Sequence, residues 1–254
     1  MRMKAALAGV VLAVALGGGA CSDPLAPGDQ GRVGIRFRTA SLAEVNGGEL
    51  VITGSNGTLR ITDISFIVNE FELEADEDAC QGQGSNDGCE EFEAPPVFAR
   101  LPLDGDNLVT VTTMVPAGTY HELEFEVEDI DLDDDDEEAG EIGAVAATVR
   151  AAFPNWPDEA SMVVVGTFTP TGGQPVPFTV FFDAEIGIEK ALVPPLVVNE
   201  ANQTVTIELD PSVWFRRFDG TVLNLSAFDF AVTGELLEFE AELKDGFQEI
   251  EFDD

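Results

Sequence analysis

Histidine, tyrosine, cysteine and lysine are all scarce in this chain of 254 residues. It contains one His, one Tyr and three Cys, and three of its 12 basic residues are Lys. With a single histidine, His121, the chain cannot form a multi-histidine metal site, and it offers only one candidate for a Ser-His-Asp arrangement. Phosphate-loop, dinucleotide-binding and Gly-x-Ser-x-Gly motifs are also missing. The residues therefore give no support for an enzyme.

Positive charge is the second deficit. The 12 Lys plus Arg are outnumbered by 49 Asp plus Glu, which gives a formal net charge of -37. Nucleic-acid binding, and adsorption to anionic lipid by electrostatics alone, need basic residues and are close to excluded. Cationic partners and divalent metal ions remain compatible with this composition. Adaptation to high salt would explain it equally well, and we favour that interpretation over specific cation recognition.

The first 20 residues predict export. Arg2 and Lys4 precede the apolar run 5–16, which is followed by the small residues 17–20. Basic, apolar and small-residue regions in this order are typical of a secretory signal peptide, and the apolar run is too short to span a membrane.

The residue after this signal predicts a lipid anchor. The string Leu16-Gly17-Gly18-Gly19-Ala20-Cys21 resembles the lipobox of bacterial lipoproteins, in which the Cys is diacylated and becomes the N-terminus. Gly18 stands where that family usually has Leu, and the alternative is cleavage after Ala20 without acylation. The resemblance implies an exported protein held by Cys21 at the bacterial outer membrane or periplasmic face. The Pro and Gly content that follows Cys21 predicts a flexible tether over 21–31.

The other two cysteines predict a disulfide. If Cys21 carries lipid, Cys80 and Cys89 form an even pair in an oxidising compartment. They bracket the polar, Gly-rich stretch 81–88, so the bond would close a short loop and add about 2 to 3 kcal/mol of stability.

Alternating polar and apolar residues dominate the chain from residue 32 onward. The clearest case is 119–128, where Leu123, Phe125 and Val127 alternate with glutamates. Many short strands at this spacing predict a mostly β domain over 32–254, an antiparallel β-sandwich. Beyond the strand around Val33 to Phe37, the expected strands are 49–53, 58–62, 64–74, 97–103, 108–114, 119–128, 162–169, 176–183, 196–199 and 204–209.

Two segments interrupt this pattern and predict helices. The first is the short Ala-rich segment Ile142 to Phe153, which ends before a proline. The second is Glu235 to Ile250, where large apolar residues recur at helical spacing and predict a C-terminal amphipathic helix. A weak echo between the stretches that begin at Pro95 and Pro194 leaves two related halves as an option.

A family resemblance covers the middle of the chain. It is carried by the stretches 68–73, 89–93 and 101–103, by Val115-Pro116-Ala117-Gly118-Thr119-Tyr120 with Leu123-Glu124-Phe125, and by 192–198. Together these resemble uncharacterised bacterial envelope lipoproteins with a β-sandwich domain of unknown function. The resemblance implies a fold and a location, and it transfers no catalytic residue.

The acidic run 129–138 is a candidate calcium site. Carboxylates stand at the alternate positions Asp129, Asp131, Asp133 and Asp135, and carboxylate oxygens are the ligands that calcium prefers. The run fails the EF-hand spacing of Gly and Glu, however. A solvated acidic loop without a bound metal is the alternative, and we favour it. No cofactor is otherwise expected.

Two tryptophans are candidate ligand contacts. Trp156 is flanked by two prolines in an expected loop, and Trp214 precedes a short aromatic and basic cluster. Packing in the core is the more common role of such residues. We expect a non-enzymatic, lipid-anchored envelope module for an unknown protein or glycan partner. The alternatives are a calcium-stabilised or carbohydrate-binding domain, and a carbohydrate-active enzyme with paired carboxylates.

Overall fold

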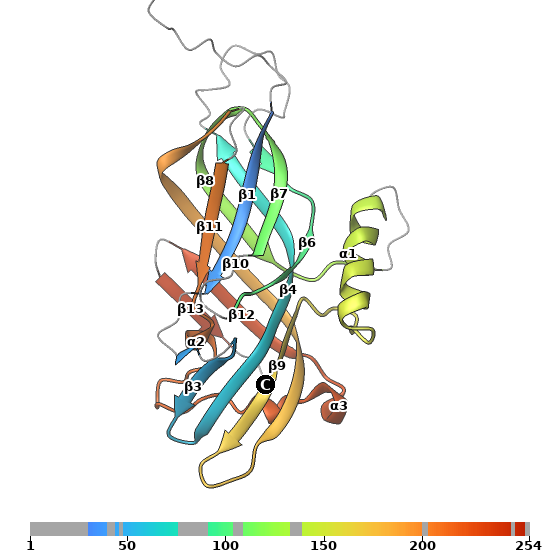
Figure 1. Ribbon diagram of the computed structural model, residues 1–254, viewed down its shortest axis with the longest axis vertical. Helices are drawn as coiled ribbons and strands as arrows, with labels where there is room; N and C mark the ends of the chain where they lie inside the picture. Colours follow the sequence, from blue (N-terminus) through green and yellow to red (C-terminus); the bar gives the residue numbers. More distant parts are fainter. Residues whose placement is uncertain are drawn as a thin grey trace, which may run out of the picture.

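The protein is a β-sandwich of two unequal sheets (Figure 1). The smaller sheet has the order β11 (Gln203–Leu209), β1 (Gln30–Thr39) and β7 (Val109–Pro116). The expected sandwich is thereby confirmed. The computed structural model of the protein describes residues 30–39, 44–45, 48–75, 91–103, 109–132, 139–199, 203–244 and 247–251.

The larger sheet is built on two long strands. β4 (Gly57–Ala75) and β10 (Val176–Val198) each run most of its length and pair with several shorter strands in turn. Pairs are antiparallel except for β1 with β11 and β10 with β12. The shorter strands are β2 (Glu44–Val45), β3 (Leu50–Gly54), β5 (Glu91–Glu93), β6 (Val97–Arg100), β8 (Gly118–Val127), β9 (Met162–Pro170), β12 (Leu237–Lys244) and β13 (Phe247–Glu251).

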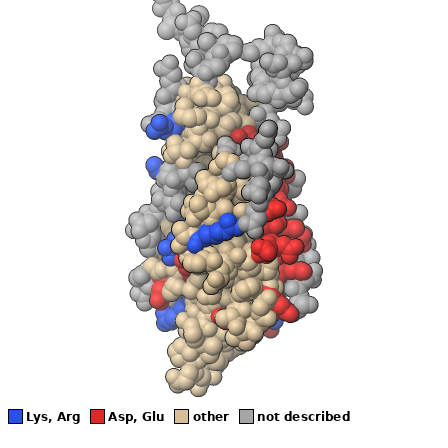
Figure 2. Space-filling model, turned by 90° about the vertical axis from the view of Figure 1, so that its right-hand side faces the viewer, with Lys and Arg blue, Asp and Glu red and all other residues tan. Residues whose placement is uncertain are grey.

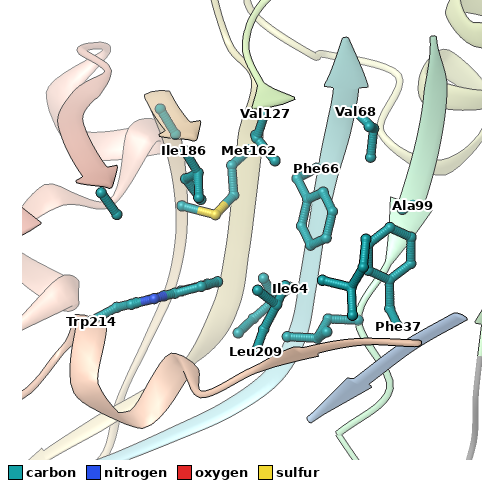
Figure 3. Packing of buried hydrophobic residues seen from close by; sticks show 14 of the residues in the cluster. Phe37, Ile64, Phe66, Val68, Ala99, Val127, Met162, Ile186, Leu209 and Trp214 are labelled. Carbon is teal, nitrogen blue, oxygen red and sulfur yellow. The ribbon is translucent and has the colours of Figure 1, made fainter. Parts of the chain in front are cut away.

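The core lies between the sheets and follows from the alternation of apolar residues. Phe66 of β4 and Phe125 of β8 are fully buried against Phe37 of β1, and the ring centroids of Phe37 lie 5.7 and 5.4 Å from theirs. Figure 3 shows Phe37, Phe66, Met162 and Trp214 within one continuous cluster. Each fully buried Phe contributes about 1.5 to 3 kcal/mol relative to an exposed one, so this cluster is the main source of stability.

β8 and β9 lie end to end between β4 and β10. Val127, the last residue of β8, is paired with Val68 and Ile186, while Met162, the first residue of β9, is paired with Phe66 and Phe182. The chain between them leaves the sheet at this junction and returns to it. This excursion includes the only long described helix, α1 (Ala139–Ala152), which agrees with the helix expected at Ile142 to Phe153.

Ser161 joins the returning chain to the sheet. Its backbone carbonyl accepts from Ile67 N at 2.8 Å, and its hydroxyl accepts from Ala184 N at 2.7 Å and donates to Ala184 O at 2.8 Å. The side chain thus replaces a strand partner at the junction, and it is completely buried.

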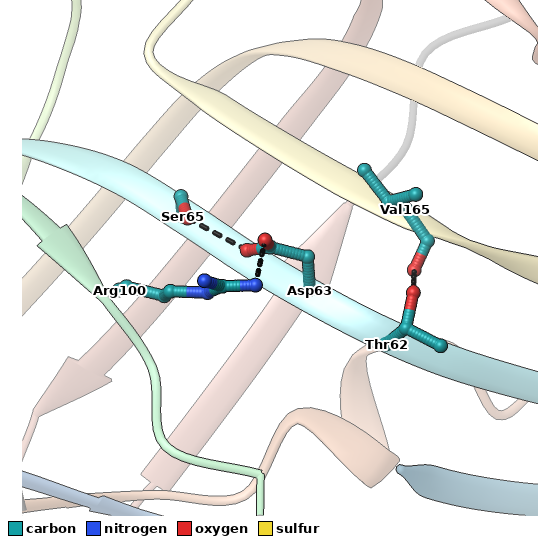
Figure 4. Close-up of polar contacts among 5 residues, drawn as sticks. All are labelled: Thr62, Asp63, Ser65, Arg100 and Val165. Atoms are coloured by element: carbon teal, nitrogen blue, oxygen red, sulfur yellow. Dashed lines mark hydrogen bonds and ion pairs between the residues drawn. The ribbon is translucent and has the colours of Figure 1, made fainter. Parts of the chain in front are cut away.

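A bulge in β4 is held by polar contacts on the outward side of the sheet. The register with β9 shifts between Ile61 and Asp63, which leaves Thr62 as the extra residue. Asp63 accepts a hydrogen bond from Ser65 at 2.7 Å and forms an ion pair with Arg100 of β6, while Thr62 donates to Val165 O at 3.2 Å (Figure 4). The extra residue keeps Ile64 and Phe66 directed into the core.

The predicted C-terminal amphipathic helix is wrong. Residues Leu237–Lys244 form β12 and Phe247–Glu251 form β13, the edge of the large sheet. Leu237, Phe239 and Ala241 are buried, and the glutamates between them point outward. Pairing of β12 with β10 therefore decided the conformation over the helical spacing. The only described helices in this part of the chain are the short α2 (Pro211–Trp214), η2 (Leu225–Phe228) and α3 (Phe230–Thr233).

Other boundaries also differ from the expectations. The segments expected at 58–62 and 64–74 are one strand, β4, because the bulge lets pairing continue. Those at 176–183 and 196–199 are likewise the single strand β10. β1 begins at Gln30, so two residues expected in the tether belong to the sheet, where they pair with Pro116 and Val115.

Removal of the Ser161 hydroxyl tests this junction. In Ser161→Ala the buried Ala184 N–H loses its acceptor, so we expect a loss of about 1 to 3 kcal/mol in the free energy of unfolding, measured by urea denaturation. Thr148→Ala removes an exposed hydroxyl on α1 and is the matched control, with an expected change within about 0.5 kcal/mol. Equal stability of the two variants would contradict the role given to Ser161.

Candidate functional site

The outward side of the large sheet carries a continuous row of acids across four strands, which we call the carboxylate face. It follows from the same alternation that builds the core, because every second residue points away from it. Figure 2 shows acidic atoms gathered along one side of that view, while basic atoms are scattered. The face consists of Glu70, Glu72 and Glu74 of β4, Glu122, Glu124 and Glu126 of β8 with Glu128 directly after it, Asp183, Glu185 and Glu189 of β10, and Glu238 and Glu240 of β12.

Strand register places these acids directly opposite one another. Glu126 is paired with Glu70, and Glu124 is paired with Glu72 on one side and Glu189 on the other. The row continues onto β12, where Glu185 is paired with Glu240. Like charges opposite each other in a sheet are destabilising, so this arrangement opposes folding at neutral pH.

Four of these acids have a pKa above the ordinary value. A hydrogen bond with Glu189 is the main cause for Glu122. For Glu126, Asp183 and Glu185 the main cause is burial, which the negative charges of neighbouring carboxylates reinforce. The face therefore holds its protons more tightly than isolated carboxylates would.

A glycine interrupts the face at its centre. Gly187 lies on β10 between Glu185 and Glu189, and a Cβ atom at this position would meet nothing within 4 Å. The missing side chain leaves a hollow of about 160 Å³, whose rim carries four carboxylates. These belong to Glu126, Glu128, Glu185 and Glu240.

A larger cleft opens where the chain leaves the sheet between β8 and β9. It has a volume of about 380 Å³, within the range of small-ligand sites. Its wall includes Trp156, Arg150 of α1 and the carboxylates of Asp129, Asp158 and Glu159. Asp129 and Glu159 also help raise the pKa of Asp183, so the cleft borders the carboxylate face.

Glu159 has an unusual backbone conformation at this cleft. Its φ of 62° is the only positive value at a non-glycine residue in the described part of the chain. Strained residues of this kind gather at functional sites when the surrounding structure holds them. The conformation gives the cleft a second distinguishing feature besides its carboxylates.

Of the two predicted tryptophans, only Trp156 reaches this site. It is half-buried, its ring packs edge-on against Phe98 and Phe181, and its indole N–H donates to Ala160 O at 2.8 Å. Trp214 is 2% exposed and packs against Phe215 and Phe239 in the core. Its burial leaves no ring surface that a ligand could reach, so the expectation of a ligand contact does not fit Trp214.

The predicted calcium ligands are only partly described. Asp129 and Asp131 both line the cleft, whereas Asp133 and Asp135 lie outside the described residues. Among described residues, a group whose ligand atoms all lie within 4.8 Å of one another occurs elsewhere, on the carboxylate face. That group is Glu72, Glu74 and Glu124.

The three cysteines, for which the sequence predicts a lipid on Cys21 and a disulfide between Cys80 and Cys89, also lie outside the described residues. His121 is half-buried at the start of β8, with no second histidine in the chain. No described helix is long and apolar enough to cross a membrane.

Comparisons with protein-family models, with curated proteins and with solved structures each found no match. The site is therefore interpreted from its own geometry.

Replacement of one carboxylate tests the electrostatic cost of the face. The pKa of Glu126 is raised above its ordinary 4.5, so its ionised form opposes folding above the raised pKa and this penalty disappears as the pH falls to about 4.5. At pH 7 and low salt, Glu126→Gln should increase the free energy of unfolding by about 0.2 to 1 kcal/mol, with no gain at pH 4. The measurement is urea denaturation at both pH values.

Glu208→Gln is the control for this experiment. Glu208 lies on β11, outside the carboxylate face, and its carboxylate is 3.7 Å from the guanidinium of Arg38. The control should gain no stability at pH 7. If Glu126→Gln were also neutral or destabilising at low salt, the inferred repulsion would be wrong.

Proposed function

We propose that this protein is a non-enzymatic binding module of the bacterial cell envelope, held by a lipid on Cys21, that binds a cationic partner through its carboxylate face. The observation that carries the proposal is the cross-strand register of the acids. A folded sheet tolerates such repulsion only where the core compensates for it, and a ligand with several positive charges would relieve it.

The distribution of acids favours a binding surface over general adaptation to salt. Salt adaptation needs a repulsive surface on every side, whereas the twelve acids of the face occupy neighbouring positions on one sheet. No Lys or Arg is among the described outward side chains between them. The strand register places one Lys, Lys244, opposite Glu189 at the end of β12. A flat strip of this kind matches an extended cation, such as a Lys-rich or Arg-rich segment of a protein.

The cleft beside the face supplies the means of selecting the partner. Trp156 and Pro157 give it an apolar wall, and carboxylates surround them. An ammonium or guanidinium group on an apolar stem could place its charge at Asp129 or Glu159 and its stem against Trp156. The face would then attract the partner, and the cleft would hold one of its side chains.

The location of the protein rests on Cys21, and mass spectrometry tests it directly. Full-length protein produced in a bacterium should yield an N-terminal peptide that begins at Cys21 and carries the mass of its acyl chains. Cys21→Ala should abolish this modification and release the protein from the membrane fraction. An unmodified Cys21 at the mature N-terminus would remove the anchor from the proposal.

Binding of a short lysine peptide tests the carboxylate face. We expect affinity that falls steeply with added salt, measured by calorimetric titration. A variant with Gln at Glu124, Glu126, Glu185 and Glu240 should bind more weakly than the wild type. The matched control has Gln at Glu49, Glu208 and Glu235 and Asn at Asp219, which lie outside the face and change the net charge equally.

The two variants separate a specific surface from bulk charge. Equal weakening of peptide binding in both variants would mean that only net charge matters, and the proposed face would be wrong.

A calcium titration at matched ionic strength tests the second candidate function, a calcium-stabilised domain, which the proximity of Glu72, Glu74 and Glu124 favours. A melting temperature that rises with calcium and falls in excess chelator would support that candidate.

A further inference from the structure

A short apolar segment leaves the sheet near the end of β10. Ala191 is paired with Glu122 and Leu196 with Tyr120, so the four residues between them bulge out of the ladder. They are Leu192, Val193, Pro194 and Pro195, and none carries a charge. Val193 is 90% exposed and both prolines are exposed. On a protein with a net charge of -37, an exposed apolar protrusion requires an explanation.

Other exposed apolar residues lie at the same end of the sandwich. Val197, just beyond the bulge, is 52% exposed, and Met114 of β7 is 46% exposed. They are two of the five large hydrophobic residues other than Val193 that are exposed among the described residues. Half of the six exposed large hydrophobic residues among those described therefore lie at this end, and these three are Val193, Val197 and Met114.

This end is also where the described part of the chain begins. Gln30 is paired with Pro116, two residues from Met114, and a Cβ atom on Gly31 would collide with the backbone oxygen of Asn199 at the end of β10. Figure 1 shows the start of β1 at the upper end of the sandwich, with α3 in the lower part. Only nine positions separate Cys21 from Gln30, and a chain of that length spans at most about 30 Å.

We infer that the bulge Leu192–Pro195, with Val197 and Met114, contacts the lipid bilayer in which the Cys21 anchor is embedded. This inference rests on the anchor in the proposed function and adds a second, non-covalent contact. The short tether keeps the upper end near the bilayer surface, and Val193 is the most exposed of the large hydrophobic residues at this end.

The chemistry of the bulge fits the hydrocarbon boundary of a bilayer. Its four residues have no charge to desolvate, and prolines restrict the backbone and lack N–H groups that would need partners in lipid. The acyl chains on Cys21 supply the attachment itself, and apolar contacts of the bulge would add buried area to it. Contact at this end would also orient the molecule, with the β3–β4 and β9–β10 turns at its opposite end directed away from the membrane.

Two tryptophan variants of the full-length protein test the inference. Val193→Trp places a fluorescent ring on the bulge, and Val232→Trp places one at a matched position on α3, where Val232 is 82% exposed. Each protein, with its natural N-terminus, is reconstituted into phosphatidylcholine vesicles with brominated acyl chains, which quench nearby Trp emission. Trp156 and Trp214 contribute the same background to both.

We expect the Val193→Trp protein to lose emission in brominated vesicles, with a shift to shorter wavelength, and the Val232→Trp protein to show neither change. If neither variant were quenched although mass spectrometry found acylated Cys21, the bulge contact would be wrong and the anchor would stand. Equal quenching of both would also overturn the inference, because the molecule would then lie along the membrane.

Two further outcomes complete the test. Quenching of the Val193→Trp protein without acylation at Cys21 would support the bulge contact and refute the anchor. A shift to shorter wavelength without vesicles that grows with protein concentration would assign the bulge to contact between copies of the chain, and it would overturn the bilayer inference.

Discussion

Burial of the inward sides of β4 and β10 against the small sheet is the interaction on which the rest of the structure depends. Both strands alternate apolar and polar residues, so the side chains that enter the core fix where the acids point. Each buried Phe or Leu contributes about 1.5 to 3 kcal/mol, whereas a repulsive cross-strand pair costs at most about 1 kcal/mol. The core therefore outweighs the repulsion, and the carboxylate face can exist on a stable protein.

The same two strands divide the outward side of the sheet into different halves. In one half Ile67 and Phe181 are outward residues that α1 and the ring of Trp156 cover. In the other half the outward acids are half-buried or exposed, except Glu72, which is 7% exposed. The boundary falls where the chain leaves β8 and returns through Ser161 to β9. The cleft lies at this boundary because both an apolar wall and carboxylates are available there.

Much of this architecture could be predicted from the sequence, because local alternation is enough to identify strands such as β8. The carboxylate face could not be predicted, since Glu122 to Glu128 look like ordinary solvent-facing residues until Glu70 and Glu189 are paired beside them. Register between distant strands is a property of the fold. The helix predicted for the C-terminal segment was wrong for a related reason. The apolar residues of this segment fit both the helical spacing and the alternation of a strand. The strand conformation prevails because β10 offers β12 an edge with which to pair.

The candidate sites show the same limit. Trp156 and Trp214 are equivalent in the sequence, since each is a lone Trp near prolines or aromatics. In the structure Trp156 borders a cleft and Trp214 fills part of the core. Trp156 belongs to the segment that leaves the sheet between β8 and β9, whereas Trp214 belongs to α2. What distinguishes a binding residue from a packing residue here is the distance of its segment from the core.

Orientation links the acidic and apolar surfaces to one function. A polyanionic face gains nothing from contact with an anionic bilayer, so a protein tethered by a short segment needs a way to keep that face exposed to the aqueous phase. An uncharged protrusion at the anchored end supplies it, because the carboxylates of β10 and β12 extend along the sheet away from that end. The position of the bulge near Gln30 is then as important as its composition. The same four residues at the opposite end would leave the orientation of the carboxylate face to the tether alone.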